Sequence, residues 1–147
     1  MVESGDVSAL RSLVLFTNTL CTRLEGLGGP PKCRQDEAEG TPVQALPFLG
    51  SEGSFIRSAE IENWQGIEVA GLYAIYEVSP DVFVEEYYPA GEYAILFVGE
   101  VDRSPVSLRV RDGGIVRVDH YPGASITDLE GIIEREAASI ILSPPRE

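Results

Sequence analysis

The side chains best able to do chemistry are acidic and aromatic residues concentrated in one part of the chain. No lysine or arginine lies between Arg57 and Arg103, yet this interval holds ten of the 24 acidic residues and eight of the 12 aromatic residues. The acids are Glu60, Glu62, Glu68, Glu77, Asp81, Glu85, Glu86, Glu92, Glu100 and Asp102. The aromatic residues are Trp64, Tyr73, Tyr76, Phe83, Tyr87, Tyr88, Tyr93 and Phe97. Unbalanced acids repel one another, and Tyr and Trp are enriched at interface hot spots, so the interval predicts a docking surface for a basic protein.

Seven residues of this interval are the expected partner contacts: Trp64, Glu77, Asp81, Glu85, Glu86, Tyr87 and Glu92. Alternation along an extended strand puts Glu85 and Tyr87 on one side and turns Tyr88 toward the core. The competing interpretation is that the aromatic residues fill the core, while the acids only solubilise the exteriors of the strands.

A second cluster is basic. Arg103, Arg109, Arg111 and Arg117 supply four of the 11 basic residues and lie in or beside one predicted hairpin. They could form an anion pocket, which predicts thermal stabilisation by phosphate or sulfate. Arginines on a hairpin also pair with nearby carboxylates, here Asp119. A small-anion or ligand-binding module built on 103–117 is therefore the alternative to a docking surface.

The sequence offers few groups for catalysis. His120 is the one histidine, and no serine or cysteine lies in a nucleophile-elbow or papain-like context. Gly113 and Gly114 open a strand, whereas a phosphate-binding loop opens a helix and supplies a lysine. We therefore expect a protein that is not an enzyme and that needs no cofactor or metal. A less favoured alternative is a carboxylate-dependent hydrolase, which predicts a cleft carboxyl with a raised pKa.

Cys21 and Cys33 are the only cysteines, too few for a disulfide framework or a four-ligand zinc site. The sequence favours two free thiols, with Cys21 as a small apolar residue on a helix. A bridge between the two stays open and would imply an oxidising compartment.

Length and charge exclude several classes of protein. The 147 residues suit one domain, 1–147, and the formal charge of −13 lacks the surplus of Lys and Arg that a grip on nucleic-acid phosphates needs. No apolar run approaches the ~20 residues of a membrane helix, and 1–6 do not resemble a signal peptide. We expect a cytoplasmic protein that binds neither nucleic acid nor membrane. The sequence does not decide between monomer and dimer.

The hydrophobic pattern predicts an α+β fold. Apolar residues spaced by three and four predict an N-terminal helix over 6–24 and a C-terminal helix over 127–141, the latter with Thr127 and Glu130 at capping-box spacing. A long surface loop is expected over 28–54, with at most a short strand at 43–48. Strands are expected at 55–61, 67–78, 82–88 and 92–101, with 67–78 central. We expect an antiparallel sheet of five or six strands, with both helices packed on one face.

The clearest local prediction is a hairpin over 106–120. A three-residue loop at Asp112-Gly113-Gly114 keeps one face apolar, because it pairs Leu108 with Val118 and Val106 with His120. The same register pairs Val110 with Val116 and puts Arg109 opposite Arg117. Gly114 is then expected at the left-handed bulge position.

Several segments together resemble one family. They are Gly71-Leu72-Tyr73-Ala74-Ile75-Tyr76, Tyr87-Tyr88-Pro89, the run from Tyr93 to Glu100, the hairpin 106–120 and the closing helix from Ser125 to Glu134. In this order of strands and turns the chain resembles the SUKH superfamily of bacterial immunity proteins. The resemblance implies a cytoplasmic, non-catalytic protein that binds and neutralises a toxin domain, often a nuclease. It supplies no catalytic residues, and the expected contacts come from charge and aromatic clustering alone.

Overall fold

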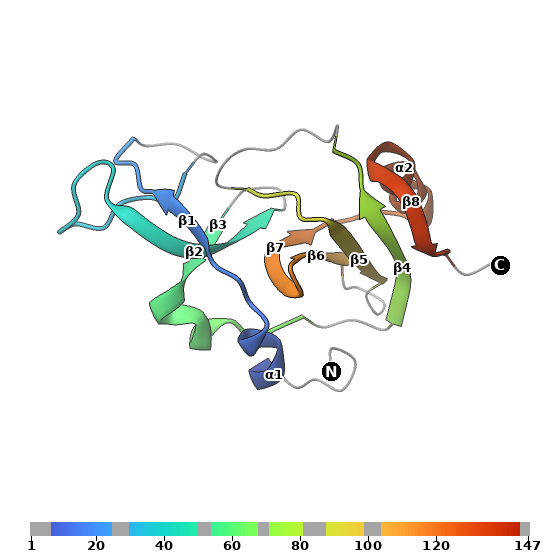
Figure 1. The fold of residues 1–147 in the computed structure, drawn as a ribbon, viewed down its shortest axis with the longest axis horizontal. Coiled ribbons are helices and arrows are strands. Elements are labelled where there is room, and N and C mark those ends of the chain that lie inside the picture. The colour runs from blue at the N-terminus through green and yellow to red at the C-terminus, as the bar shows by residue number, and fades with distance from the viewer. Residues whose placement is uncertain are drawn as a thin grey trace.

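The computed structural model describes residues 7–24, 30–49, 54–67, 71–80, 88–98 and 104–144, which form an α+β fold (Figure 1). In chain order the elements are α1 (Val7–Ser12), β1 (Thr17–Leu20), β2 (Pro42–Leu49), β3 (Ser54–Arg57), the 3-10 helix η1 (Ser58–Asn63), β4 (Gly71–Val78), β5 (Tyr93–Val98), β6 (Val106–Arg111), β7 (Gly114–His120), α2 (Ile126–Glu136) and β8 (Ala137–Leu142). Of the strand expected over 82–88, only Tyr88 lies among the described residues.

All eight strands in the described part of the chain belong to one sheet. Its order is β1-β2-β7-β6-β5-β4-β8, with β3 paired to β2. The sheet is mixed, because β2 runs parallel to β7 while the other strand pairs are antiparallel. The expectation of a purely antiparallel sheet of five or six strands was wrong in this detail. The parallel pair joins segments far apart in sequence, which no hairpin pattern reveals.

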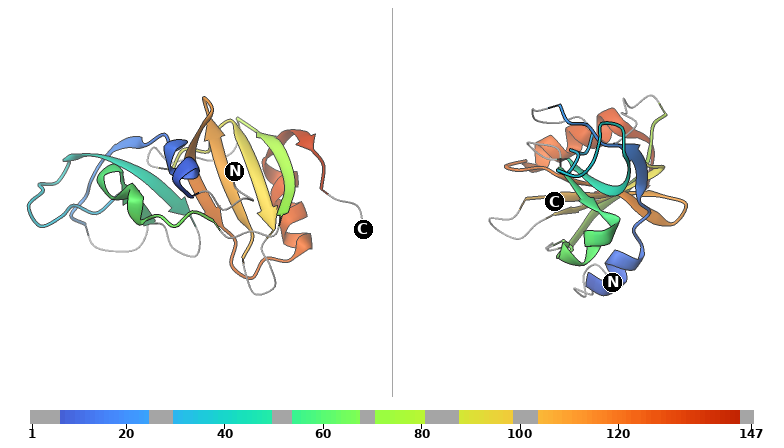
Figure 2. Two further views of the ribbon diagram at one scale, coloured as in Figure 1. Left: turned by 90° about the horizontal axis from the view of Figure 1, so that it is seen from below. Right: turned by 90° about the vertical axis from the view of Figure 1, so that its left-hand side faces the viewer.

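The two helices cover opposite faces of the sheet, and the expectation that they share one face was wrong (Figure 2). Leu10 of α1 packs with Leu108 and Val118, whereas α2 packs through Leu129 and Ile133 on side chains of the other face. Apolar residues therefore line both faces of the central strands, as expected when each face carries a covering layer.

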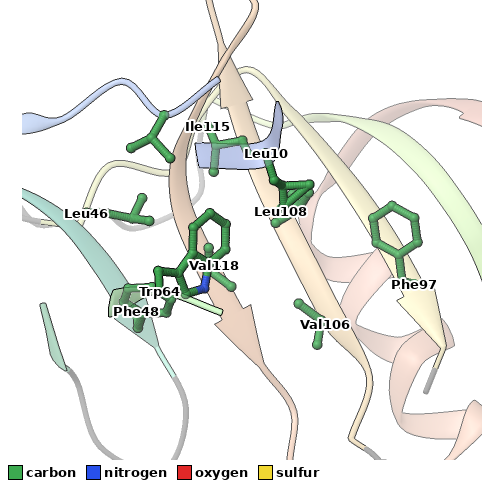
Figure 3. Packing of buried hydrophobic residues seen from close by; sticks show 10 residues of the cluster. Leu10, Leu46, Phe48, Trp64, Phe97, Val106, Leu108, Ile115 and Val118 are labelled. Atoms are coloured by element: carbon green, nitrogen blue, oxygen red, sulfur yellow. The ribbon is translucent and has the colours of Figure 1, made fainter. Parts of the chain in front are cut away.

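The larger core lies under α1 and η1 (Figure 3). Trp64 follows η1 and meets Phe48 of β2 edge to face, with ring centroids 6.0 Å apart. Around them lie Leu10, Val14, Leu46, Phe97, Val106, Leu108, Ile115 and Val118. This cluster joins the N-terminal third of the chain to the central hairpin.

The N-terminal helix is shorter than its periodicity predicts. α1 covers six residues, and the chain then continues as β1, paired antiparallel with β2. Thr19 and Cys21 are buried while Asn18 and Leu20 are exposed, which is the alternation of a strand. β-branched Thr17 and Thr19 have low helix propensity, and pairing with β2 satisfies their backbone groups.

The hairpin confirms the predicted register except at its tip. Val106 pairs with His120, Leu108 with Val118 and Arg109 with Arg117. The turn has two residues, Asp112 (φ 53°) and Gly113 (φ 79°), so Gly114 is not the left-handed residue. The extra residue sits further along β7, because the register shifts between the pairs Arg109–Arg117 and Val110–Ile115 and leaves Val116 unpaired.

The C-terminal helix begins and ends earlier than predicted. Ser125, not Thr127, caps α2, and a reciprocal capping box joins it to Asp128. The helix ends at Glu136, and 137–142 form β8 along the outer side of β4. The predicted position of 67–78 inside the sheet is correct for β4 because β8 pairs with it. None of the described helices is long and apolar enough to cross a membrane.

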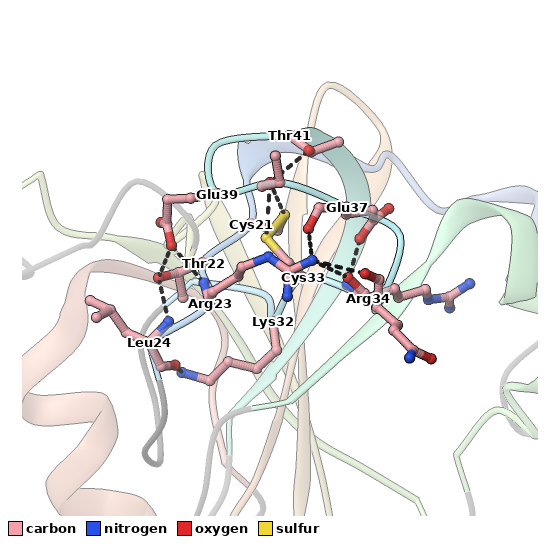
Figure 4. The surroundings of a disulfide bond; sticks show 12 residues. Cys21, Thr22, Arg23, Leu24, Lys32, Cys33, Arg34, Glu37, Glu39 and Thr41 are labelled. Atoms are coloured by element: carbon pink, nitrogen blue, oxygen red, sulfur yellow. Dashed lines mark hydrogen bonds between the residues drawn. A yellow bond between two sulfur atoms is a disulfide. The ribbon is translucent and has the colours of Figure 1, made fainter.

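A disulfide between Cys21 and Cys33 staples the segment between β1 and β2, so the expectation of free thiols was wrong (Figure 4). Polar contacts reinforce it. Glu39 accepts hydrogen bonds from the backbone N–H of Arg23 (2.7 Å) and the hydroxyl of Thr22 (3.3 Å). Part of the expected loop 28–54 is therefore ordered, and β2 contains the short strand expected at 43–48.

An ion pair ties the same segment to β3. The Arg57 guanidinium donates to both carboxylate oxygens of Glu37, at 2.6 and 2.7 Å. These hydrogen bonds, with one from the backbone N–H of Arg34, lower the pKa of Glu37 to about 2. The folded state is therefore stabilised by the ionised form of the Glu37 side chain.

Reduction of the disulfide should destabilise the protein. The bridge closes a span of 12 residues, for which the loss of loop entropy in the unfolded chain predicts about 3 kcal/mol. Urea unfolding with and without dithiothreitol measures the difference, and Cys33→Ser should reproduce it. Two titratable thiols in the denatured, untreated protein would contradict the bridge.

Candidate partner-binding surface

Two arginines are buried in the sheet directly opposite each other. Arg109 of β6 and Arg117 of β7 are cross-strand partners, and 0% and 5% of their surfaces are exposed. Two positive charges on directly opposite residues repel each other strongly in the low-dielectric interior of a protein. The fold tolerates them because carboxylates on the same side of the sheet neutralise both.

Asp119 and Glu136 supply these carboxylates. Asp119 accepts two hydrogen bonds from Arg117, at 2.7 and 2.8 Å, and also forms an ion pair with Arg109, whose Nε lies 3.2 Å away. Glu136, the last residue of α2, pairs with Arg109 Nη2. The ion pairs therefore fasten the end of α2 to the middle of the sheet.

Two tyrosines complete this buried network. Tyr76 of β4 donates its hydroxyl hydrogen bond to Glu136 at 2.7 Å, and Tyr121 lies 3.4 Å from Asp119. Burial raises the pKa of Tyr76, and burial with the charge of Asp119 raises that of Tyr121 to about 12. Burial alone would lower the pKa of Arg109, but the charges of Asp119 and Glu136 raise it overall.

The network positions β8. The backbone carbonyl of Glu136 accepts a hydrogen bond from Ser79 at 2.7 Å, just beyond the end of β4. The chain then turns directly into β8, where Ser139 donates to Glu77 of β4 at 3.3 Å. Because buried ion pairs fix the end of α2, the residues that follow lie along the outer side of β4 and form β8.

An acidic and aromatic surface lies beside β8. Glu77 of β4 pairs across the sheet with Tyr93 of β5, and both are exposed, Tyr93 at 39%. Exposed Glu92 precedes Tyr93 and is placed by Gly91, where a Cβ would lie 3.1 Å from backbone atoms of Val110. We call Glu77, Glu92 and Tyr93 the β4–β5 surface.

Apolar side chains extend this surface along β8. Ile140, Ile141 and Leu142 are 51%, 58% and 42% exposed, and we call them the β8 strip. Leu142 pairs with Ile75 and Ser139 with Glu77 on the face of the β4–β5 surface, whereas Ile140 pairs with Tyr76 on the opposite face. The strip therefore runs along the edge of the sheet next to Glu77. Large apolar residues exposed together along one sheet edge are typical of an interaction surface.

The structure brings together only part of the expected contact set. Glu77 and Glu92 are exposed and close to each other through the backbone bond from Val78 to Glu92 (2.8 Å). Trp64, by contrast, is 5% exposed and belongs to the core. Asp81, Glu85, Glu86 and Tyr87 lie outside the described residues.

Most of the clustered aromatic residues serve the core. Tyr73, Tyr76, Tyr88 and Phe97 are buried as Trp64 is, so the expectation that Tyr88 turns toward the core is confirmed. The exposed exception among the described aromatics of the interval is Tyr93. Sequence clustering therefore located the acidic part of the surface better than its aromatic part.

The arginine hairpin does not present an open anion pocket in the described part of the chain. Arg109 and Arg117 are buried and paired with carboxylates, as the second interpretation of the cluster proposed. His120 stacks on Phe48, and burial lowers its pKa. No group of three or more His, Cys, Asp or Glu residues suited to a metal ion occurs among the described residues.

Comparisons with protein-family models, with curated proteins and with solved structures find no match to this chain. The candidate surface is therefore argued from its own geometry. Sequence reasoning missed the β8 strip, because its isoleucines fit the apolar stripe of a helix as well as an exposed strand. The β-branched pair Ile140-Ile141 was the available signal for a strand.

Removal of one member of the buried network should be costly. Arg109→Leu leaves Glu136 without its charged partner, and breaking a buried pair in this way costs about 3–5 kcal/mol. Arg111→Leu is the matched control, because Arg111 is exposed on the same strand and should change stability by about 0.5 kcal/mol or less. Equal losses in urea unfolding would contradict the structural role of Arg109.

The raised tyrosine pKa values predict a loss of stability in alkali. The unfolded chain releases its phenol protons near pH 10, before the folded protein does, so stability is complete below pH 10 and falls as pH rises toward 12. A variant with Tyr76→Phe and Tyr121→Phe should give a flatter profile of unfolding free energy above pH 10. An unchanged slope would contradict this assignment.

Proposed function

We propose that this chain is a non-catalytic immunity or inhibitor protein that binds and neutralises a basic toxin enzyme of the nuclease type. Its docking surface is the β4–β5 surface, and it acts by occluding the partner without cofactor or metal. The interpretation agrees with the resemblance to SUKH immunity proteins. It assigns no nucleic-acid or membrane partner to the chain itself.

The observation that supports this function most strongly is the separation of charge. Around the disulfide segment, Arg57 pairs with Glu37 and Arg34 pairs with Glu60. Arg109 and Arg117 are paired with carboxylates inside the fold. Neither Glu77 nor Glu92 forms an ion pair within the described part of the chain. Glu77 and Glu92 therefore contribute to the net charge of −13 as exposed acids without a paired base in the described part of the chain.

Such a surface suits a basic partner for two physical reasons. Complementary charge steers the encounter and makes the association rate depend on salt. Tyr93 adds contact area with a polar handle, as tyrosines at interface hot spots do. Glu77 and Tyr93 face each other as a cross-strand pair, so one partner patch can engage both.

The cytoplasmic location belongs to this proposal and must accommodate the Cys21–Cys33 disulfide. Cytosolic thiols are kept reduced, whereas disulfides persist in oxidising compartments. Trapping of thiols with maleimide in freshly lysed cells decides between the reducing cytosol and an oxidising compartment. Reduced cysteines support the cytoplasm, and an intact bridge moves the encounter with the toxin to an oxidising compartment.

Co-expression with the product of the adjacent gene tests the function. We expect a stable complex with a basic protein whose enzyme activity is lost when it is bound. The variant Glu77→Lys with Glu92→Lys should slow association about tenfold at low salt, and the difference should shrink as salt rises.

Glu62→Lys is the matched control, because Glu62 is an exposed acid on η1, away from β4 and β5. It should change the association rate much less than the double variant. An adjacent product that is acidic, a partner that stays active in the complex, or equal effects of the two variants would each contradict the proposal.

A further inference from the structure

β8 ends the sheet with an unusual composition. It pairs with β4 on one side, and no described strand pairs with its other side. Exposed sheet edges normally carry lysine, proline or other features that discourage association. Residues 137–142 read Ala-Ala-Ser-Ile-Ile-Leu, with no charge and no proline, and the three large apolar side chains are all exposed.

The pairing of β8 contains one feature that opposes the addition of a further strand. Consecutive pairs are Ile75–Leu142, Tyr76–Ile140, Glu77–Ser139 and Val78–Ala137. Ile141 and Ala138 are therefore extra residues, and bulges twist an edge away from regular pairing. The β8 strip is better suited to contact through its side chains than through its backbone.

Charge selects the occupant. Ser139 holds Glu77 beside the strip, and the chain as a whole carries a charge of −13. A second copy of the chain would bring the same acids to this site, and like charges across an interface are repulsive. A partner with aliphatic side chains flanked by lysine or arginine matches both the apolar strip and its acidic border.

We infer that the β8 strip is the apolar anchor of the docking surface, and that it takes an aliphatic side chain of the basic partner flanked by Lys or Arg. This rests on the proposed function and specifies how the partner is held. Charge at the β4–β5 surface sets the rate of encounter, while burial of Ile140 and Ile141 slows dissociation.

A random-peptide phage library selected on the immobilised full-length protein tests this inference without knowledge of the partner. We expect enriched peptides that combine aliphatic residues with Lys or Arg. Their binding to the variant Ile140→Ser with Ile141→Ser should fall at least tenfold. The control is Leu20→Ser with Leu24→Ser, which removes apolar residues that are 57% and 74% exposed near the disulfide, and it should bind as the wild type does.

Each outcome bears on a different claim. Basic peptides that bind the β8 variant as well as the wild type, or a selection that enriches nothing, overturn the anchor but leave the proposed function standing. Enriched peptides without Lys or Arg count against the basic partner and the proposed function together. A dimer seen by light scattering that the β8 variant loses identifies a second copy as the occupant and also overturns the inference.

The variants must be folded for this comparison. Their unfolding transitions in urea should match that of the wild type, since the substituted side chains are mostly exposed. If the double variant is destabilised, Ile141→Ser alone carries the test, because Ile141 is an extra residue at a bulge and 58% exposed.

Discussion

The burial of Arg109 is the constraint on which the rest of the structure depends. A guanidinium with no exposed surface, lying opposite a second buried arginine, requires carboxylates close by. Asp119 on the neighbouring strand neutralises part of this charge, and Glu136 must come from the end of α2 to complete it. Buried ion pairs add little net stability compared with apolar residues, but their loss is expensive, so they penalise alternative arrangements of the helix.

From this constraint follows the position of the candidate surface. Because Glu136 is held against Arg109 and Tyr76, the chain leaves α2 beside the end of β4 and continues as β8. β8 makes β4 an interior strand and carries exposed isoleucines next to Glu77. The buried polar network therefore determines that the exposed β8 strip lies next to the acidic side chain of Glu77. The functional proposal depends on this proximity of apolar and acidic side chains, because neither charge alone nor apolar area alone selects a partner.

The two ends of the sheet differ in how they treat charge. Around the disulfide, bases and acids are matched locally, as in the pairs of Arg57 with Glu37 and Arg34 with Glu60. At the β4 and β5 end, exposed Glu77 and Glu92 face solvent. Ion pairs stabilise the region around the disulfide, where the buried apolar cluster is small and consists of Cys21, Val43 and Ala45. Leaving charge unmatched costs stability through repulsion and is useful where a partner supplies the opposite sign.

The sequence by itself determined what depends on neighbouring residues. Alternation along 106–120 identified the pairs Leu108–Val118 and Arg109–Arg117, and the same rule placed Tyr88 in the core. The acidic interval located Glu77 and Glu92, two exposed residues of the candidate surface. Tertiary structure alone decided that 17–20 and 137–142 are strands, that β2 runs parallel to β7, and that Cys21 meets Cys33. The reason is that a short segment satisfies helix and strand periodicity equally well. Its state is fixed by the distant strand whose backbone hydrogen bonds it completes.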